Sequence, residues 1–118
     1  MSNWQELATR FAQKHNLIHT PGVYVLDLVS EVGEVAKELL RQSDYGAGDM
    51  TFDAADTAAQ QRLAGELGDV VYSLCLLASA AGIDLNAAFH TTLQKYEERW
   101  LHKGHINSYD IKASGEKT

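Results

Sequence analysis

Two pairs of acidic residues in this sequence share a spacing that suits the binding of a metal ion. Glu31 and Glu34 stand three residues apart, and so do Glu66 and Asp69, each pair in the pattern acid-x-glycine-acid. Residues three apart lie on the same face of an α-helix. If the two helices that carry these pairs pack side by side, the four carboxylates converge on one site.

The type of these side chains indicates which metal they would bind. Clustered carboxylates repel one another, and a divalent cation removes that repulsion. Mg²⁺ and Mn²⁺ prefer oxygen ligands, and Mg²⁺ binds a few carboxylates together with water and substrate phosphate. No histidine or cysteine lies within either acid-x-glycine-acid pattern, 31–34 or 66–69, which argues against zinc. A di-iron site would need Glu-x-x-His motifs on two helices, which these pairs do not provide.

The periodicity of apolar residues predicts four helices that would position these acids. Their expected ranges are 3–15, 21–42, 54–81 and 84–102. Pro21 suits the first position of its helix, and Gly82 suits a helix end. Asp53 and Asp84 are the expected N-caps of the third and fourth helices. We therefore predict an all-α, four-helix bundle-like chain with a long loop over 43–53.

The composition indicates one globular domain. The chain has 118 residues, of which 45% are hydrophobic, and its formal net charge of −6 argues against a general binder of nucleic acid. Its longest apolar run, VVYSLCLLASAAGI, is shorter than the roughly 20 residues of a membrane span. The single cysteine, Cys75, permits no internal disulfide, so a cytoplasmic location is expected. We assign residues 1–102 to the domain and 103–118 to a polar, mobile tail.

The helix expected over 54–81 is apolar on more than one side, with Leu67, Val70 and Leu74 among its apolar residues. A helix of this kind must be covered nearly all round. Four helices in a small chain do not easily supply that cover. We therefore expect a homo-oligomer, either a dimer or a tetramer, that assembles through this third helix.

Three glycines lie beside the acids, at positions 33, 65 and 68, and each costs a helix up to about 1 kcal/mol relative to alanine. Their missing side chains would allow two helix backbones to approach closely, or would leave room for a ligand. Asp27 and Glu38 extend the acidic stripe of the second helix in both directions.

The acidic pairs sit in segments that read LVSEVGEVAKELL and GELGDVVYSLCLLA. Together these segments resemble the MazG-like superfamily of all-α nucleoside triphosphate pyrophosphohydrolases, whose signature is E-x-x-E, a variable gap and E-x-x-D. The stretch HTPGVYVLDLVSEVGE is similar to the dCTP pyrophosphatase branch, and KYEERW stands where that family carries K-x-x-x-R. The resemblance covers roughly residues 4–102.

This resemblance implies hydrolysis of a (deoxy)nucleoside triphosphate to the monophosphate and pyrophosphate, with a role in nucleotide-pool housekeeping. It implies that Mg²⁺, or Mn²⁺ in its place, is bound by Glu31, Glu34, Glu66 and Asp69. A carboxylate that is not fully committed to the metal could take the proton of the attacking water, and Glu34 is our candidate for this base. Glu66 is the second predicted catalytic residue.

The resemblance also implies three substrate-binding residues. Lys95 and Arg99 would approach the phosphates, and His19 would lie near the nucleotide. Lys95 and Arg99 also stand near the end of a helix, where cations are favoured in any case. His19 is equally consistent with an ordinary turn histidine.

Two departures from the family pattern stand out. Gly22 and Val23 occupy the place where relatives often carry Arg-Asn, which leaves the nucleobase of the substrate open. Ser30 stands where many relatives carry a further glutamate, so one candidate for a supporting residue or catalytic base is missing. A catalytically silent oligomerisation or regulatory module of the same fold is the alternative function, although the four intact acids count against it.

Overall fold

The structure is a computed structural model that describes residues 3–110. It contains four helices: α1 (Asn3–Lys14), α2 (Pro21–Gln42), α3 (Thr57–Ala80) and α4 (Leu85–Lys103). Over this part of the chain all regular secondary structure is helical, so the prediction of an all-α chain with four helices is confirmed. The chain divides into two compact units, one that holds α1 to α3 and one that begins at Asp84 and holds α4.

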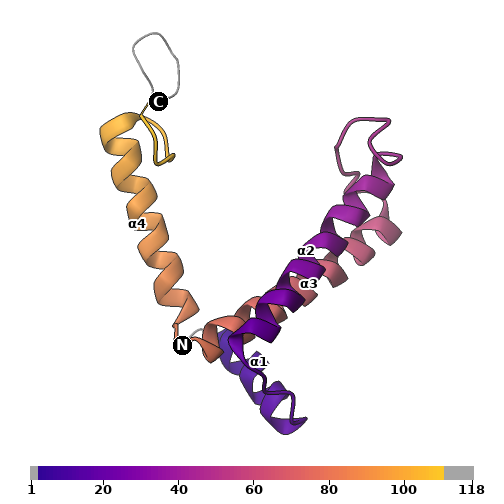
Figure 1. Cartoon of the computed structure of the whole chain (residues 1–118). Coiled ribbons are helices and arrows are strands. Elements are labelled where there is room, and N and C mark those ends of the chain that lie inside the picture. The colour runs from indigo at the N-terminus through magenta and orange to yellow at the C-terminus, as the bar shows by residue number, and fades with distance from the viewer. Residues whose placement is uncertain (1–2, 111–118) are drawn as a thin grey trace. The chain divides into compact units, whose positions relative to one another are not determined.

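In the first unit α2 and α3 form an antiparallel pair. Figure 1 shows them side by side, joined at one end by a loop, and α1 packs against α3 near the other end. The core is small and consists mainly of short side chains. Its buried hydrophobic residues are Ala8, Ala12, Tyr24, Ala59, Cys75, Leu76 and Ala78. Gln5 is also fully buried, and its Nε2 donates to the carbonyl oxygen of Ile83 at 2.6 Å.

The start of α3 differs from the sequence prediction. The N-cap is Asp56, whose side chain accepts a hydrogen bond from Ala59 N at 3.1 Å, so the prediction of Asp53 as the cap was wrong. Asp53 forms a local turn in which its Oδ1 accepts from Ala55 N at 2.9 Å. Aspartate favours both arrangements, and its sequence position alone does not distinguish a turn from a cap.

The loop after α2 begins with an unusual backbone turn. Asp44, Tyr45 and Gly46 all have positive φ angles, of 54°, 56° and 88°. Such angles are uncommon outside glycine and carry a conformational cost. Ser43 holds the turn: its hydroxyl donates to Leu40 O at 3.0 Å and accepts from Gly46 N at 3.1 Å. Both ends of α2 are therefore defined locally, because Pro21 occupies the first turn as predicted.

Helix α3 is only partly buried within its unit. Five of its residues are buried, namely Ala59, Ser73, Cys75, Leu76 and Ala78. By length and composition alone Thr57–Ala80 could cross a membrane, a test that the core helices of soluble proteins also pass, and 22% of its apolar window is buried. The expected cover by a second copy stays a prediction.

The second unit consists of α4 and the segment that follows it. Asp84 caps the helix by accepting from Ala87 N at 3.3 Å, as predicted. After Gly104, at a φ of 75°, the chain turns back, and Arg99 Nη1 donates to the carbonyl oxygen of Ile106 at 3.0 Å. The predicted tail over 103–118 extends beyond the described residues, because 111–118 lie outside them.

Candidate metal centre and nucleotide pocket

Three of the four predicted metal ligands come together between α2 and α3. Glu31 projects from α2, and Glu66 and Asp69 project from α3, one turn apart. Ligand oxygens of these three residues lie within 4.8 Å of one another. Glu31 and Glu66 are half-buried and Asp69 is exposed, so the group is open to solvent on one side. This acid cluster is a set of oxygen ligands that suits Mg²⁺ or Mn²⁺.

The electrostatics of the acid cluster favour a cation. Partial burial raises the pKa of Glu31 above its ordinary value, and the negative charges of Asp69 and Glu66 raise it further. Smaller contributions to this raised pKa come from Glu34 and Asp27. Crowded carboxylates lose this repulsion when a dication binds among them.

The fourth predicted ligand, Glu34, stands apart from this group. It lies one turn beyond Glu31 on α2 and is exposed. It is near enough that its charge contributes to the raised pKa of Glu31. Its predicted roles, as a metal ligand and as the base, stay predictions.

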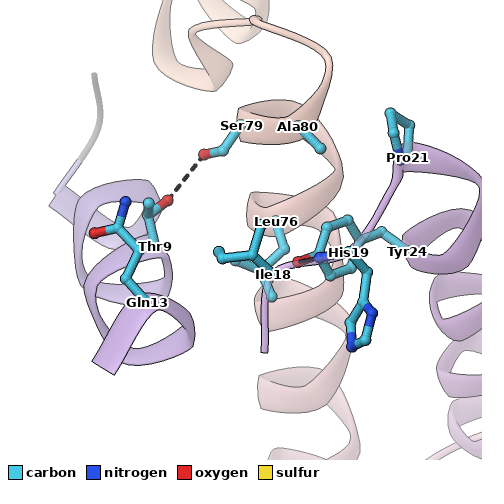
Figure 2. Close-up of a pocket in the computed structure, with 9 residues that line it drawn as sticks. All are labelled: Thr9, Gln13, Ile18, His19, Pro21, Tyr24, Leu76, Ser79 and Ala80. Carbon is cyan, nitrogen blue, oxygen red and sulfur yellow. Dashed lines mark hydrogen bonds between the residues drawn. The ribbon is translucent and has the colours of Figure 1, made fainter. Parts of the chain in front are cut away.

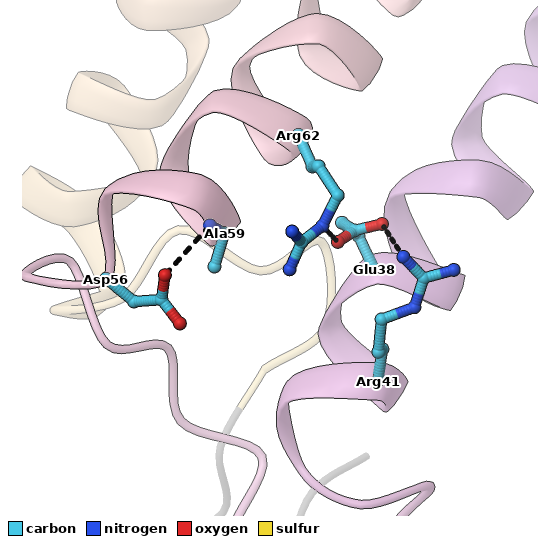
Figure 3. Close-up of polar contacts among 5 residues, drawn as sticks. All are labelled: Glu38, Arg41, Asp56, Ala59 and Arg62. Atoms are coloured by element: carbon cyan, nitrogen blue, oxygen red, sulfur yellow. Dashed lines mark hydrogen bonds and ion pairs between the residues drawn. The ribbon is translucent and has the colours of Figure 1, made fainter.

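Glu38, at the other end of the predicted acidic stripe, has a different environment. It is only 6% exposed. Figure 3 shows its ion pairs with two arginines. Arg62 on α3 donates from Nε to Glu38 Oε1 at 2.6 Å, and Arg41 on α2 lies 3.4 Å from Oε2. Sequence reasoning missed this pair because the register between two helices is not visible in either helix alone.

The glycines near the acids do not mark close helix contacts within this unit. A Cβ added at Gly33, Gly65 or Gly68 would meet no atom within 4 Å among the residues described. Within the described residues of one chain these glycines therefore do not serve a close approach of helix backbones, and such an approach between copies stays a prediction. The alternative, that they leave room beside the acids for a ligand, stays a prediction.

A pocket of about 340 Å³ lies between α1, the start of α2 and the end of α3. Figure 2 shows the residues that line it: Thr9, Gln13, Ile18, His19, Pro21, Tyr24, Leu76, Ser79 and Ala80. We call this the α1–α3 pocket. It combines apolar walls with hydroxyl, amide and imidazole groups, a composition that is typical of small-molecule sites.

His19 and Tyr24 shape one side of this pocket. The backbone N–H of His19 donates to the Tyr24 hydroxyl at 2.8 Å, and that hydroxyl donates to Leu17 O at 2.9 Å. The two rings meet edge to face with centroids 6.0 Å apart. His19 is thus a pocket residue whose backbone is fixed by buried Tyr24, whereas its role in binding substrate stays a prediction.

The α1–α3 pocket and the acid cluster lie one after the other along the pair of helices α2 and α3. Glu31 follows Tyr24 by seven positions on α2, and Leu76 follows Asp69 by seven positions on α3. Because α2 and α3 are antiparallel, pocket and cluster stand about two helical turns, or ~10.5 Å, apart along the pair.

The two predicted phosphate-binding residues belong to the α4 unit. Lys95 is exposed, and its Nζ lies 5.5 Å from the centroid of the Tyr96 ring. Arg99 is half-buried and is held by the carbonyl oxygen of Ile106. Their predicted contacts with phosphate are not tested by these observations.

Comparison with known protein families identifies the domain that carries the acid cluster. No curated protein sequence matches this chain. The family model of the MazG nucleotide pyrophosphohydrolase domain matches residues 19–103, a stretch that includes the whole acid cluster and most of the chain. The general resemblance inferred from the acidic motifs is therefore confirmed, whereas the dCTP pyrophosphatase branch is not specifically shown. The chain belongs to the MazG nucleotide pyrophosphohydrolase domain family.

Proposed function

We propose that this protein hydrolyses a (deoxy)nucleoside triphosphate to the monophosphate and pyrophosphate in a metal-dependent reaction. The observation that carries the proposal is the acid cluster, in which ligand oxygens of Glu31, Glu66 and Asp69 lie within 4.8 Å of one another. Membership of the MazG domain family supports a nucleotide substrate. Mg²⁺ is the proposed cofactor, with Mn²⁺ as a substitute, because both prefer oxygen ligands.

The acid cluster has a binding role in this proposal. Glu31, Glu66 and Asp69 are the proposed metal ligands, with Glu34 as a further ligand one turn away. When bound, the dication would offset the charge of the triphosphate and lower the pKa of a water poised to attack phosphorus. Glu34 is the proposed base for that water, because it is exposed and lies outside the tight group of three.

The α1–α3 pocket is the proposed nucleoside site. Its volume of about 340 Å³ falls within the range of small-ligand sites, about 300–1,000 Å³. Tyr24 and Glu31 are two turns apart on one face of α2, so a nucleoside in the pocket would direct its phosphates along the helix pair toward the acids. His19 would contact the nucleoside.

Lys95 and Arg99 are the proposed contacts to the phosphate groups. Charge develops on the pyrophosphate leaving group as the bond breaks, and cations that hydrogen-bond to it stabilise that charge. In the α4 unit the Arg99 guanidinium is held by its hydrogen bond to the carbonyl oxygen of Ile106 at 3.0 Å.

A homo-oligomer, either a dimer or a tetramer, is the proposed assembly. Within the unit of α1 to α3, large apolar side chains of α2 are strongly exposed, with Leu26 at 71%, Val29 at 67% and Val32 at 51%. On α3, Leu67 is 47% exposed. Exposed apolar patches of this kind mark interaction surfaces. Light scattering should give a multiple of the chain mass, and Val29→Glu should lower it; a wild-type monomer at micromolar concentration would contradict the proposal.

The reaction is tested with a panel of nucleotides in the presence of Mg²⁺. We expect pyrophosphate and the monophosphate as products, loss of turnover in EDTA, and recovery on addition of Mg²⁺ or Mn²⁺. Release of orthophosphate alone would mean that the terminal bond is cut, and full turnover in excess chelator would exclude the metal. A folded protein that hydrolyses no nucleotide would favour the silent oligomerisation or regulatory module instead.

A further inference from the structure

Glu38 and Arg62 form an ion pair that crosses from α2 to α3. The Glu38 side chain is 7% exposed, and Arg62 Nε donates to its Oε1 at 2.6 Å. Figure 3 shows Arg62 reaching this carboxylate from α3. Arg41 lies 3.4 Å from the second carboxylate oxygen, but it belongs to the same helix as Glu38. Of these two ion pairs of Glu38, the one with Arg62 crosses between the helices and the one with Arg41 lies within α2.

Stability alone is a poor explanation for this buried charge. The free energy needed to remove two charges from water is about as large as their attraction in the protein. Replacement of such a pair by apolar residues is therefore often neutral or stabilising. The best-attested use of such a pair is to fix one alignment among several. Along α2 the buried residues are Tyr24 and Glu38, so apolar packing alone gives this helix little preference among registers.

The Glu38–Arg62 ion pair lies at a fixed spacing from the acid cluster on both helices. Glu38 follows Glu31 by seven residues on α2, and Arg62 precedes Asp69 by seven residues on α3. The ion pair and the acid cluster are thus successive contacts of one antiparallel helix pair, about two turns apart. A slip of one turn, ~5.4 Å, would separate Glu31 from the acids of α3.

We propose that Glu38 and Arg62 are positioning residues that set the register of α2 against α3 and so assemble the acid cluster for a divalent metal ion. The inference rests on the proposed function, in which that cluster holds the metal. Arg41 also pairs with the Glu38 carboxylate. It does not fix the register, because it belongs to α2 itself and makes no ion pair with α3 through this contact.

The test compares Arg62→Gln with Arg41→Gln as a matched control. Each variant removes one positive charge from the same carboxylate, in the first case across the helices and in the second within α2. The dissociation constant of Mn²⁺ alone is measured by electron paramagnetic resonance on the full chain, with circular dichroism as the check of folding. We expect roughly tenfold weaker Mn²⁺ binding for Arg62→Gln, comparable to the loss of other supporting contacts at metal sites. Arg41→Gln should stay close to wild type.

The expected sign is opposite to that of simple electrostatics. Loss of a cation near an acidic site should strengthen Mn²⁺ binding if charge alone mattered. Weaker binding by Arg62→Gln therefore supports control of the register. Arg62→Lys keeps the cation and should restore binding to near the wild-type value.

A second variant separates register from stability. Glu38→Leu combined with Arg62→Leu removes the buried carboxylate together with its more exposed cationic partner, so its Tm should equal or exceed that of wild type. Its Mn²⁺ binding should still be weaker. Wild-type affinity in this double variant, or failure of both it and Arg62→Gln to fold, would overturn the inference.

The outcome for wild type distinguishes the two proposals. If wild type binds Mn²⁺ and the cross-helix variants bind it equally well, the register inference is wrong and the proposed function stands. If wild type binds no Mn²⁺, the metal site itself is wrong, and both proposals fail.

Discussion

Replacement of Glu66 by glutamine should stabilise the metal-free protein while weakening its binding of metal. The variant keeps the size of the side chain and removes one of three charges whose ligand oxygens lie within 4.8 Å of one another. Glu66 and Asp69 are one turn apart on α3, and like charges so spaced cost a helix roughly 0.2–0.5 kcal/mol. The Tm of Glu66→Gln in EDTA should therefore rise by roughly 1–3 °C.

The effect of Glu66→Gln on metal binding has the opposite sign and is larger. A carboxylate and a dication about 4 Å apart attract each other by about 2 kcal/mol in water, which is the lower limit for a half-buried side chain. Loss of about 2 kcal/mol weakens binding about 30-fold. The dissociation constant of Mn²⁺, followed by electron paramagnetic resonance, should rise by at least this factor, and turnover should be nearly lost.

A control variant distinguishes the loss of a metal ligand from the loss of one negative charge anywhere on the protein. Asp49→Asn removes the same unit charge from an exposed position in the loop between α2 and α3. We expect this variant to bind Mn²⁺ like wild type. Unchanged Mn²⁺ binding by Glu66→Gln, or a lower Tm of that variant in EDTA, would refute the reasoning.

Three further predictions concern pH, the pocket and the start of α3. In EDTA the Tm should fall as pH rises from about 4.5, the ordinary pKa of a glutamate, through the raised folded pKa of Glu31, because partial burial and nearby acids disfavour its ionised form. Glu31→Gln should reduce this slope, and a slope equal to that of wild type would contradict the assignment. Tyr24→Phe removes the hydroxyl that joins His19 N–H to Leu17 O. The KM for the nucleotide should therefore rise by a larger factor than kcat falls. A loss confined to kcat would count against the nucleoside pocket. Asp56→Ala should cost about 1 kcal/mol in urea unfolding with Mn²⁺ affinity unchanged, and no measurable loss of stability would show that the cap is unimportant.

The elements of the fold were largely predictable because their signals are local. Helical periodicity, Pro21 at a first turn and Asp84 at a cap each act within a few residues, and the structure confirms them. The exception at Asp53 and Asp56 has the same origin: two aspartates three residues apart both accept backbone hydrogen bonds, and only the folded turn decides which one starts α3.

The site was predictable only in part because it joins two helices. The spacing of Glu66 and Asp69 fixes their common face, and their meeting with Glu31 followed once α2 and α3 were expected to pack together. The ion pair of Glu38 with Arg62 was not predicted, because an acid in a stripe looks the same whether it faces solvent or an arginine. A charged residue seven positions from each acidic motif is the signal that could have found it.

The α1–α3 pocket depends on contacts distant in the sequence. The hydroxyls of Thr9 and Ser79 are 3.0 Å apart in space and belong to helices far apart along the chain. No spacing rule connects such residues. The predicted roles of Lys95, Arg99 and His19 rest on the family resemblance, because no local pattern in the sequence assigns them.

Crystals soaked in Mn²⁺ would reveal whether α2 and α3 together hold a divalent metal ion between their acids. We expect anomalous density for an ion bonded to carboxylate oxygens of Glu31, Glu66 and Asp69. Well-ordered acids that point apart into solvent, with no ion between them, would contradict it.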